Sequence, residues 1–153
     1  MNAPGIKDAY VNGQKYRTTN RNGVVVYDGM KPYRENHLML DVSQSDSEAE
    51  LRGNRKIAAP YRGAVVLVNF DTDQRKPWFI KALRADGQPL TFGYEVNDIH
   101  GHNIGVVGQG SQLFIRTNEV PPSVNVAIDK QQGLSCTITF GKEIDESRNY
   151  ICR

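Results

Sequence analysis

The chain has 153 residues, of which 39% are hydrophobic and 24% charged, and its 19 basic and 17 acidic side chains leave a net charge of +2. This balance excludes a disordered chain and predicts either one ordinary domain or two small ones. The basic residues are scattered rather than gathered into a stripe, which argues against nucleic-acid binding. No apolar run reaches the roughly 18 residues that a membrane-spanning helix needs.

Turn dipeptides separate short strand-like runs along most of the chain, at the spacing typical of β-hairpins. They are Asn12-Gly13, Asn22-Gly23 and Asp86-Gly87, with Gly101 as a further turn glycine. This punctuation predicts an all-β fold made of antiparallel sheets.

The charged, poorly periodic stretch 46–59 predicts a linker between two modules, residues 1–58 and 59–153. The best helix candidate, residues 43–51, has too few apolar positions to form a stripe. We therefore expect a connector there, with at most one helical turn.

The second module contains β-branched and aromatic runs bounded by Gly, Pro or charged residues, as strands are. We expect its strands near residues 63–70, 78–84, 92–97, 104–107, 112–117, 123–128 and 135–140. Strands of this number and length form a β-sandwich of immunoglobulin-like size.

Alternation within the run 63–70 places Val65 and Leu67 on the same face as Asn69. The asparagine marks this face as the outer one. Two apolar side chains on a solvent-facing surface predict a binding surface there.

Two further predicted strands, 78–84 and 112–117, also carry large apolar side chains. Alternation shows which of these side chains share a face, but it does not always show which face is exposed. Phe114 alternates with Leu113 and therefore belongs to the polar side of its strand, whereas Trp78 and Ile80 share one face of the run 78–84. Which face of that run is outward is not decided by period. A second sheet and the neighbouring module could also cover both faces.

The stretch 98–110, with sequence DIHGHNIGVVGQG, suggests two kinds of ligand site. A phosphate loop would have to open onto a helix, but a predicted strand follows Gly110. Asp98, His100 and His102 could form a metal triad in an extended segment. The glycine between the histidines favours a turn that would separate their side chains, so we expect no metal or cofactor site.

Catalytic motifs are also missing from the sequence. No Gly-x-Ser-x-Gly nucleophile elbow occurs, and carboxylate pairs such as Glu143 and Asp145 lie in charged, loop-like surroundings. We therefore expect no enzyme activity.

The two cysteines, Cys136 and Cys152, have a spacing that suits closure of one loop between a strand and a terminal segment. A pair of free thiols in the core is the alternative. A disulfide would require an oxidising compartment. The start of the chain lacks signal-peptide features and by itself suggests a cytosolic protein, so a disulfide would imply a fragment of a longer exported protein.

Several stretches resemble one family, and they occur in the family's order along the chain. They are PGIKDA at 4–9, PYREN at 32–36 with LD at 40–41, PYRGA at 60–64, GQPLTFG at 87–93, and the pair Cys136 and Cys152. Together they resemble the C-terminal periplasmic region of fimbrial outer-membrane usher proteins of the chaperone-usher pathway.

The resemblance implies two consecutive small antiparallel β-sandwich domains of immunoglobulin-like type, the first of them short at its start. It also implies a location on the periplasmic side of the bacterial outer membrane. The rest of the usher, with its barrel, plug and N-terminal domain, would be a partner, as would periplasmic chaperone–pilin subunit complexes. Neither nucleic acid nor a small-molecule substrate is expected.

The implied function is docking of chaperone–subunit complexes during assembly and secretion of a pilus, with no catalytic step. An exported adhesive or structural β-sandwich is the alternative. The candidate contact residues come from alternation: they are Val65, Leu67, Trp78, Ile80 and Phe114, with Arg62 and Arg116 as rim charges.

Overall fold

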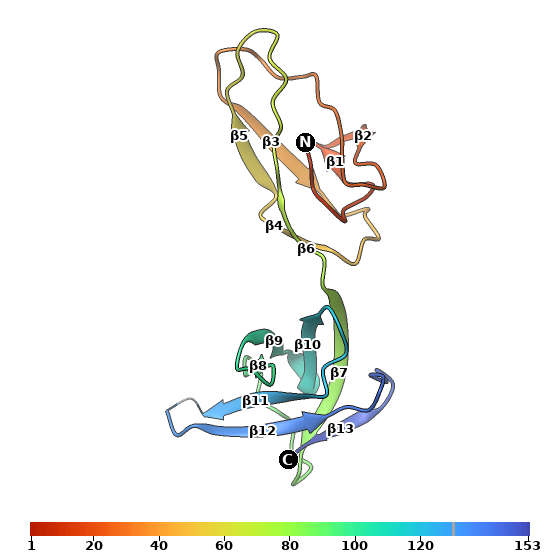
Figure 1. Ribbon diagram of the computed structural model, residues 1–153, viewed down its shortest axis with the longest axis vertical. Coiled ribbons are helices and arrows are strands. Elements are labelled where there is room, and N and C mark those ends of the chain that lie inside the picture. The colour runs from red at the N-terminus through yellow and green to blue at the C-terminus, as the bar shows by residue number, and fades with distance from the viewer. Residues whose placement is uncertain (130) are drawn as a thin grey trace. The chain divides into compact units, whose positions relative to one another are not determined.

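The structure is a computed structural model that describes residues 1–129 and 131–153 (Figure 1). Strands dominate it, and the one helical element among these residues is a short 3-10 turn, η1 (Gln109–Ser111). The all-β class predicted from the sequence is thus confirmed. No helix in the described part of the chain has the length and apolar character needed to cross a membrane.

The chain forms two compact units, Met1–Gln74 and Arg75–Arg153. The division therefore follows Gln74 and not residue 58. The reason is that Val68 and Phe70 belong to the buried core of the first unit, where they pack with Ala3 and Leu38. The linker predicted from the charged stretch 46–59 ends before these core residues, so it divides the chain too early.

The first unit contains a four-stranded antiparallel sheet in the order β2-β1-β3-β5 and a separate ribbon of β4 and β6. The bounds are β1 (Tyr10–Val11), β2 (Gln14–Thr18), β3 (Asn36–Asp41), β4 (Glu50–Arg52), β5 (Arg55–Ala58) and β6 (Asp71–Asp73). The predicted turn at Asn12-Gly13 joins β1 to β2. Both residues have positive φ, 48° and 72°, as a tight hairpin turn requires.

The connector predicted over residues 43–51 has no helical turn and ends in β4. Two serine hydroxyls attach it to the N-terminal segment. Ser45 Oγ donates to the Lys7 carbonyl at 2.6 Å, and the Lys7 amide donates to Ser47 Oγ at 2.9 Å. Short serine side chains compete with helical hydrogen bonding in this way.

The strand expected near 63–70 does not form as such. Residues 64–68 lie outside the strands, and only Asn69 makes an isolated bridge, to Asn2. Alternation still sorts the side chains as predicted at the end of the run, since Val68 and Phe70 are buried.

The second unit contains one seven-stranded sheet in the order β12-β11-β8-β9-β10-β7-β13. Its pairs are antiparallel except β13 with β7, which is parallel and departs from the antiparallel expectation. The bounds are β7 (Lys76–Arg84), β8 (Glu95–Asn97), β9 (Asn103–Val107), β10 (Gln112–Thr117), β11 (Ser123–Asp129), β12 (Leu134–Thr139) and β13 (Asn149–Cys152). The last strand was not predicted, because it is short and follows a charged loop.

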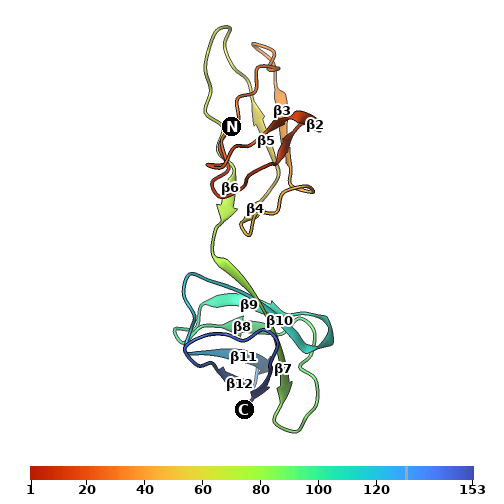
Figure 2. The same ribbon diagram turned by 90° about the vertical axis from the view of Figure 1, so that its right-hand side faces the viewer.

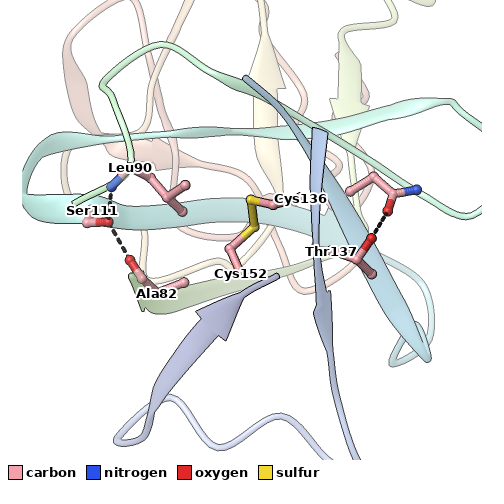
Figure 3. Close-up of a disulfide and its surroundings, with 7 residues drawn as sticks. Ala82, Leu90, Ser111, Cys136, Thr137 and Cys152 are labelled. Atoms are coloured by element: carbon pink, nitrogen blue, oxygen red, sulfur yellow. Dashed lines mark hydrogen bonds between the residues drawn. A yellow bond between two sulfur atoms is a disulfide. The ribbon is translucent and has the colours of Figure 1, made fainter. Parts of the chain in front are cut away.

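The two outermost strands of this sheet, β12 and β13, lie side by side and are joined to each other, so the sheet closes on itself (Figure 1 and Figure 2). Thr137 and Arg153 exchange backbone hydrogen bonds of 2.6 and 3.0 Å. Beside them Cys136 and Cys152 form a disulfide with Cα atoms 5.3 Å apart (Figure 3). The predicted disulfide is confirmed, and it cross-links the two edge strands beside the hydrogen bonds that pair their backbones.

Ser111 connects three segments inside the second unit (Figure 3). Its buried Oγ accepts a hydrogen bond of 2.7 Å from the Leu90 amide and donates one to the Ala82 carbonyl.

We expect Ser111→Ala to lower the free energy of unfolding by about 1–3 kcal/mol, because it leaves buried backbone groups unpaired. Urea unfolding should show this loss, whereas Ser135→Ala at an exposed position should cost little. Equal midpoints for the two variants would contradict the role.

Candidate docking surface

Three apolar side chains form a continuous row on the outward face of β9, β10 and β7. Phe114 in β10 lies directly opposite Phe79 in β7 on one side and Val106 in β9 on the other. The two phenylalanine rings are 5.2 Å apart between centroids. Phe79 is 47% exposed and Val106 is 40% exposed. We call Val106, Phe114 and Phe79 the aromatic row.

The row is outward because the alternate residues of the same strands fill the core. Leu113, Ile115 and Ile80 are fully buried. Successive side chains of a strand point to opposite faces, so Phe114 and Phe79 must face away from that core. The prediction that Phe114 lies on the polar side of its strand is confirmed.

Charged groups lie at both sides of the row. The Arg116 guanidinium carbon is 5.5 Å from the centroid of the Phe114 ring, and its Nη1 donates to the Arg75 carbonyl at 2.9 Å. Lys81 continues β7 on the other side, where it is exposed. Glu146 Oε1 accepts a 2.7 Å hydrogen bond from the Phe79 amide. An apolar centre with charged margins is the usual composition of a protein contact.

Trp78 and Ile80 do not belong to this surface. Ile80 is 0% exposed and cannot contact a partner, so its selection as a contact residue is corrected. Trp78 packs against the same core, with Nε1 donating to Thr117 Oγ1 at 3.1 Å and the Lys76 ammonium 4.1 Å from its ring centroid. Period alone did not decide which face of the run 78–84 is outward. The face that carries Trp78 and Ile80 is the inner one.

Val65, Leu67 and Arg62 lie in the first unit, whereas Phe114 and Arg116 lie in the second. The expected exposure of the two apolar side chains is confirmed, at 101% for Val65 and 70% for Leu67. The predicted contact set is thus divided between two units and does not form one surface within either.

An apolar groove of about 530 Å³ lies beside Val65 and Leu67 in the first unit. Residues 24–27 line one side and residues 64–68 the other, with Met1 at the groove and Val26 82% exposed. Sequence reasoning missed Val26, although three consecutive valines at 24–26 are a signal that it could have used. It also missed Phe79 and Val106, because only the strand register places them beside Phe114.

The 98–102 segment is a turn held by one carboxylate. Asp98 Oδ1 accepts hydrogen bonds from the amides of His100 and His102 at 2.8 and 2.9 Å, and Oδ2 lies 3.2 Å from His102 Nδ1. Desolvation raises the pKa of Asp98, but the hydrogen bonds from His102 and His100 outweigh it, so the pKa is lowered overall. Within residues 1–129 and 131–153, no group of three or more metal-ligating side chains is placed to hold an ion.

Comparison with known proteins gives a consistent result over both units. A family model described as outer membrane usher protein matches residues 1–70, and one described as PapC C-terminal domain matches residues 79–141. The crystal structure of the C-terminal domain of the PapC usher has a TM-score of 0.41 to the chain at 20% identity, covering 50% of this chain and 95% of that one. At this score the likeness carries no weight of its own.

Curated relatives are more informative. Over its full 153 residues the chain is 97% identical to the outer membrane usher protein YehB of Escherichia coli K12, covering 18% of that protein. It is 31% identical to the usher HtrE of the same organism over 89% of this chain and 16% of that protein. The chain thus spans less than a fifth of the length of these relatives. On the two family matches and this near-identity, the chain belongs to the outer membrane usher family.

Proposed function

We propose that the chain is a periplasmic docking part of an outer membrane usher and binds chaperone–subunit complexes while a pilus is assembled. The observation that carries this proposal is the aromatic row of the second unit. The family membership supplies the biological setting. The role needs neither a cofactor nor a small-molecule substrate, because it consists of holding one protein complex at a time.

The composition of the row supports reversible binding. The two phenylalanines, Phe79 exposed and Phe114 half-buried, supply apolar contact area at the centre. Arg116 and Lys81 supply charge beside it. An assembly platform has to release each complex before it accepts the next. A short row of this kind provides anchors without the large apolar interface that would make dissociation slow.

The disulfide supports the location. Disulfide bonds form and persist in oxidising compartments, which include the bacterial periplasm. Cys136 and Cys152 are bonded, and the described residues contain no free cysteine. A periplasmic position also brings the chain within reach of chaperone–subunit complexes.

The proposal is tested by calorimetry of the disulfide-bonded chain with a purified chaperone–subunit complex from the same operon, with chaperone alone as a second titrant. We expect saturable binding, weakened about 30-fold by Phe114→Asp because the aspartate places a charge at the centre of the contact, a loss of about 2 kcal/mol. Leu134→Asp is the matched control, since Leu134 is 52% exposed and lies in β12, which is not one of the three strands that carry the row.

Equal affinity of the Phe114→Asp variant and the unchanged chain would exclude the row as the docking site, provided that circular dichroism shows the variant to be folded. No binding by the folded, unchanged chain would overturn the docking role. The titration with chaperone alone separates contacts made to the chaperone from those made to the subunit.

A further inference from the structure

Strand β7 of the second unit has one edge that is only partly paired. On one side, β10 pairs with β7 over Lys76–Lys81. On the other side, β13 pairs with β7 from Lys81 to Arg84. Within the part of the chain that the structure describes, no strand pairs with this second side before Lys81. We call the stretch Pro77–Phe79 on this side the open edge.

The backbone of Phe79 faces the open edge. Its amide donates a 2.7 Å hydrogen bond to Glu146 Oε1, away from β10. In an antiparallel pair the N–H and C=O of one residue point to the same side, and alternate residues share that side. The Phe79 carbonyl and the Pro77 carbonyl therefore also point to the open edge. An extended segment placed there would find one backbone donor and two backbone acceptors.

A turn keeps the backbone of the protein's own loop away from this edge. Continuing β13 upstream in its parallel register would bring its backbone beside Phe79. Residues 145–148 form a turn instead, in which the Arg148 amide donates to the Asp145 carbonyl at 3.2 Å. The side chain of Glu146, at the centre of that turn, bonds to the Phe79 amide in place of a backbone carbonyl.

The Glu146 side chain covers the edge in a way that is easily reversed. Glu146 is exposed, and its hydrogen bond to the Phe79 amide lies at the surface. Water can replace this bond on both partners when the side chain rotates away, so its loss costs little free energy. A charged side chain over an edge also discourages edge-to-edge association. Glu146 thus protects the edge without closing it permanently.

The aromatic row ends at the open edge. Phe79 is its last member, and it is 47% exposed. A strand added at the edge would place one of its own side chains beside Phe79 on the outward face, which would lengthen the row. Cationic side chains lie on both sides of this position. Lys81 is two residues farther along β7, and Arg116 lies opposite Pro77.

We propose that the open edge accepts an extended β-strand from the chaperone–subunit complex once Glu146 releases the Phe79 amide. This inference rests on the proposed function and specifies how the docking occurs. The added strand carries an apolar side chain beside Phe79 and an acidic side chain two residues away, next to Lys81. A second copy of this chain is a poorer occupant, because pairing two open edges would bring like charges of Lys81 and Arg116 together.

The first test is calorimetry of the Glu146→Ala variant with the purified chaperone–subunit complex. We expect binding about fivefold tighter than that of the unchanged chain, because the Phe79 amide no longer has an internal acceptor. Glu143→Ala is the matched control. It removes the same charge from the same loop at an exposed position, and it should leave the affinity unchanged.

The second test measures amide hydrogen exchange at Phe79 in the Glu146→Ala variant, free and saturated with the complex. Exchange should be fast in the free variant and slower by about tenfold or more in the bound one, because the added strand accepts the amide.

Two substitutions at Phe79 distinguish pairing of the backbone from burial of the ring. In the Glu146→Ala background, Phe79→Ala and Phe79→Pro both remove the ring, but only proline also removes the N–H. Proline is tolerated at a strand edge. We expect Phe79→Pro to bind about fivefold more weakly than Phe79→Ala. Circular dichroism checks that both variants are folded, and the exchange measurement decides the question if the proline variant is not.

The outcomes separate this inference from the docking role. Binding by the unchanged chain, with equal affinities for Glu146→Ala and Glu143→Ala and no slowing at Phe79, would overturn the open-edge inference and leave docking intact. No binding by any folded variant would overturn the docking role, and this inference with it. Self-association of Glu146→Ala in sedimentation without the complex would identify a second copy as the occupant and overturn the inference.

Discussion

Replacement of both Cys136 and Cys152 by alanine is expected to lower the free energy of unfolding of the second unit by about 3 kcal/mol. The disulfide closes a loop with a sequence separation of 16, which restricts the unfolded chain. It also joins β12 to β13, next to the hydrogen bonds between Thr137 and Arg153. Both cysteines are buried, so alanine avoids placing a hydroxyl in the core.

Tryptophan fluorescence during urea unfolding measures this effect, because Trp78 is the one tryptophan of the chain and lies in the second unit. The wild-type protein with its disulfide reduced should unfold at nearly the same urea concentration as the double variant. An unchanged midpoint in the double variant would mean that the strand pairing alone holds this edge.

Ile80→Ala is expected to cost about 2–5 kcal/mol, because it leaves a cavity in a close-packed core. Ile80 is fully buried in the cluster that also contains Leu113 and Ile115. The neighbouring substitution Phe79→Ala removes a larger side chain that is 47% exposed on the other face. We expect it to cost distinctly less stability than Ile80→Ala.

Comparing Ile80→Ala with Phe79→Ala distinguishes a loss of core packing from a loss of partner binding. By urea unfolding, Ile80→Ala should be the less stable variant, and by calorimetry with a chaperone–subunit complex, Phe79→Ala should be the weaker binder among folded proteins. A larger loss of stability for Phe79→Ala than for Ile80→Ala would contradict the assignment of the two faces of β7.

The aromatic row shows how far alternation can be used. Strand period correctly separated Phe114 from Leu113, because side chains alternate along any regular strand. It could not bring Phe114 together with Phe79 and Val106, since the register between strands depends on which strands pair. The same limit explains why Ile80 was assigned to the surface, as a run with apolar side chains on both faces does not indicate its outer one.

In the run 64–70, the local backbone preference favours a strand, but most of the run has no neighbouring strand with which to pair. Its β-branched residues favour an extended backbone, and the segment is predicted as a strand on that basis. A strand also needs a partner with free backbone groups at the right distance. In this run the backbone of Val68 and Phe70 bonds to Asn2, which gives one isolated bridge at Asn69, and residues 64–68 stay outside the strands.

The amino-acid sequence by itself determined the β class and the positions of most strands and turns in the second unit, and it favoured the disulfide over free thiols and indicated the family by resemblance. These features depend on local backbone preference, side-chain alternation and the presence of two suitably spaced cysteines. Only the tertiary structure decided that the first unit extends to Gln74, that Phe79 and Val106 flank Phe114, and that Val26 and Leu67 line the same groove. These features depend on contacts between residues far apart in the chain, which no local pattern specifies.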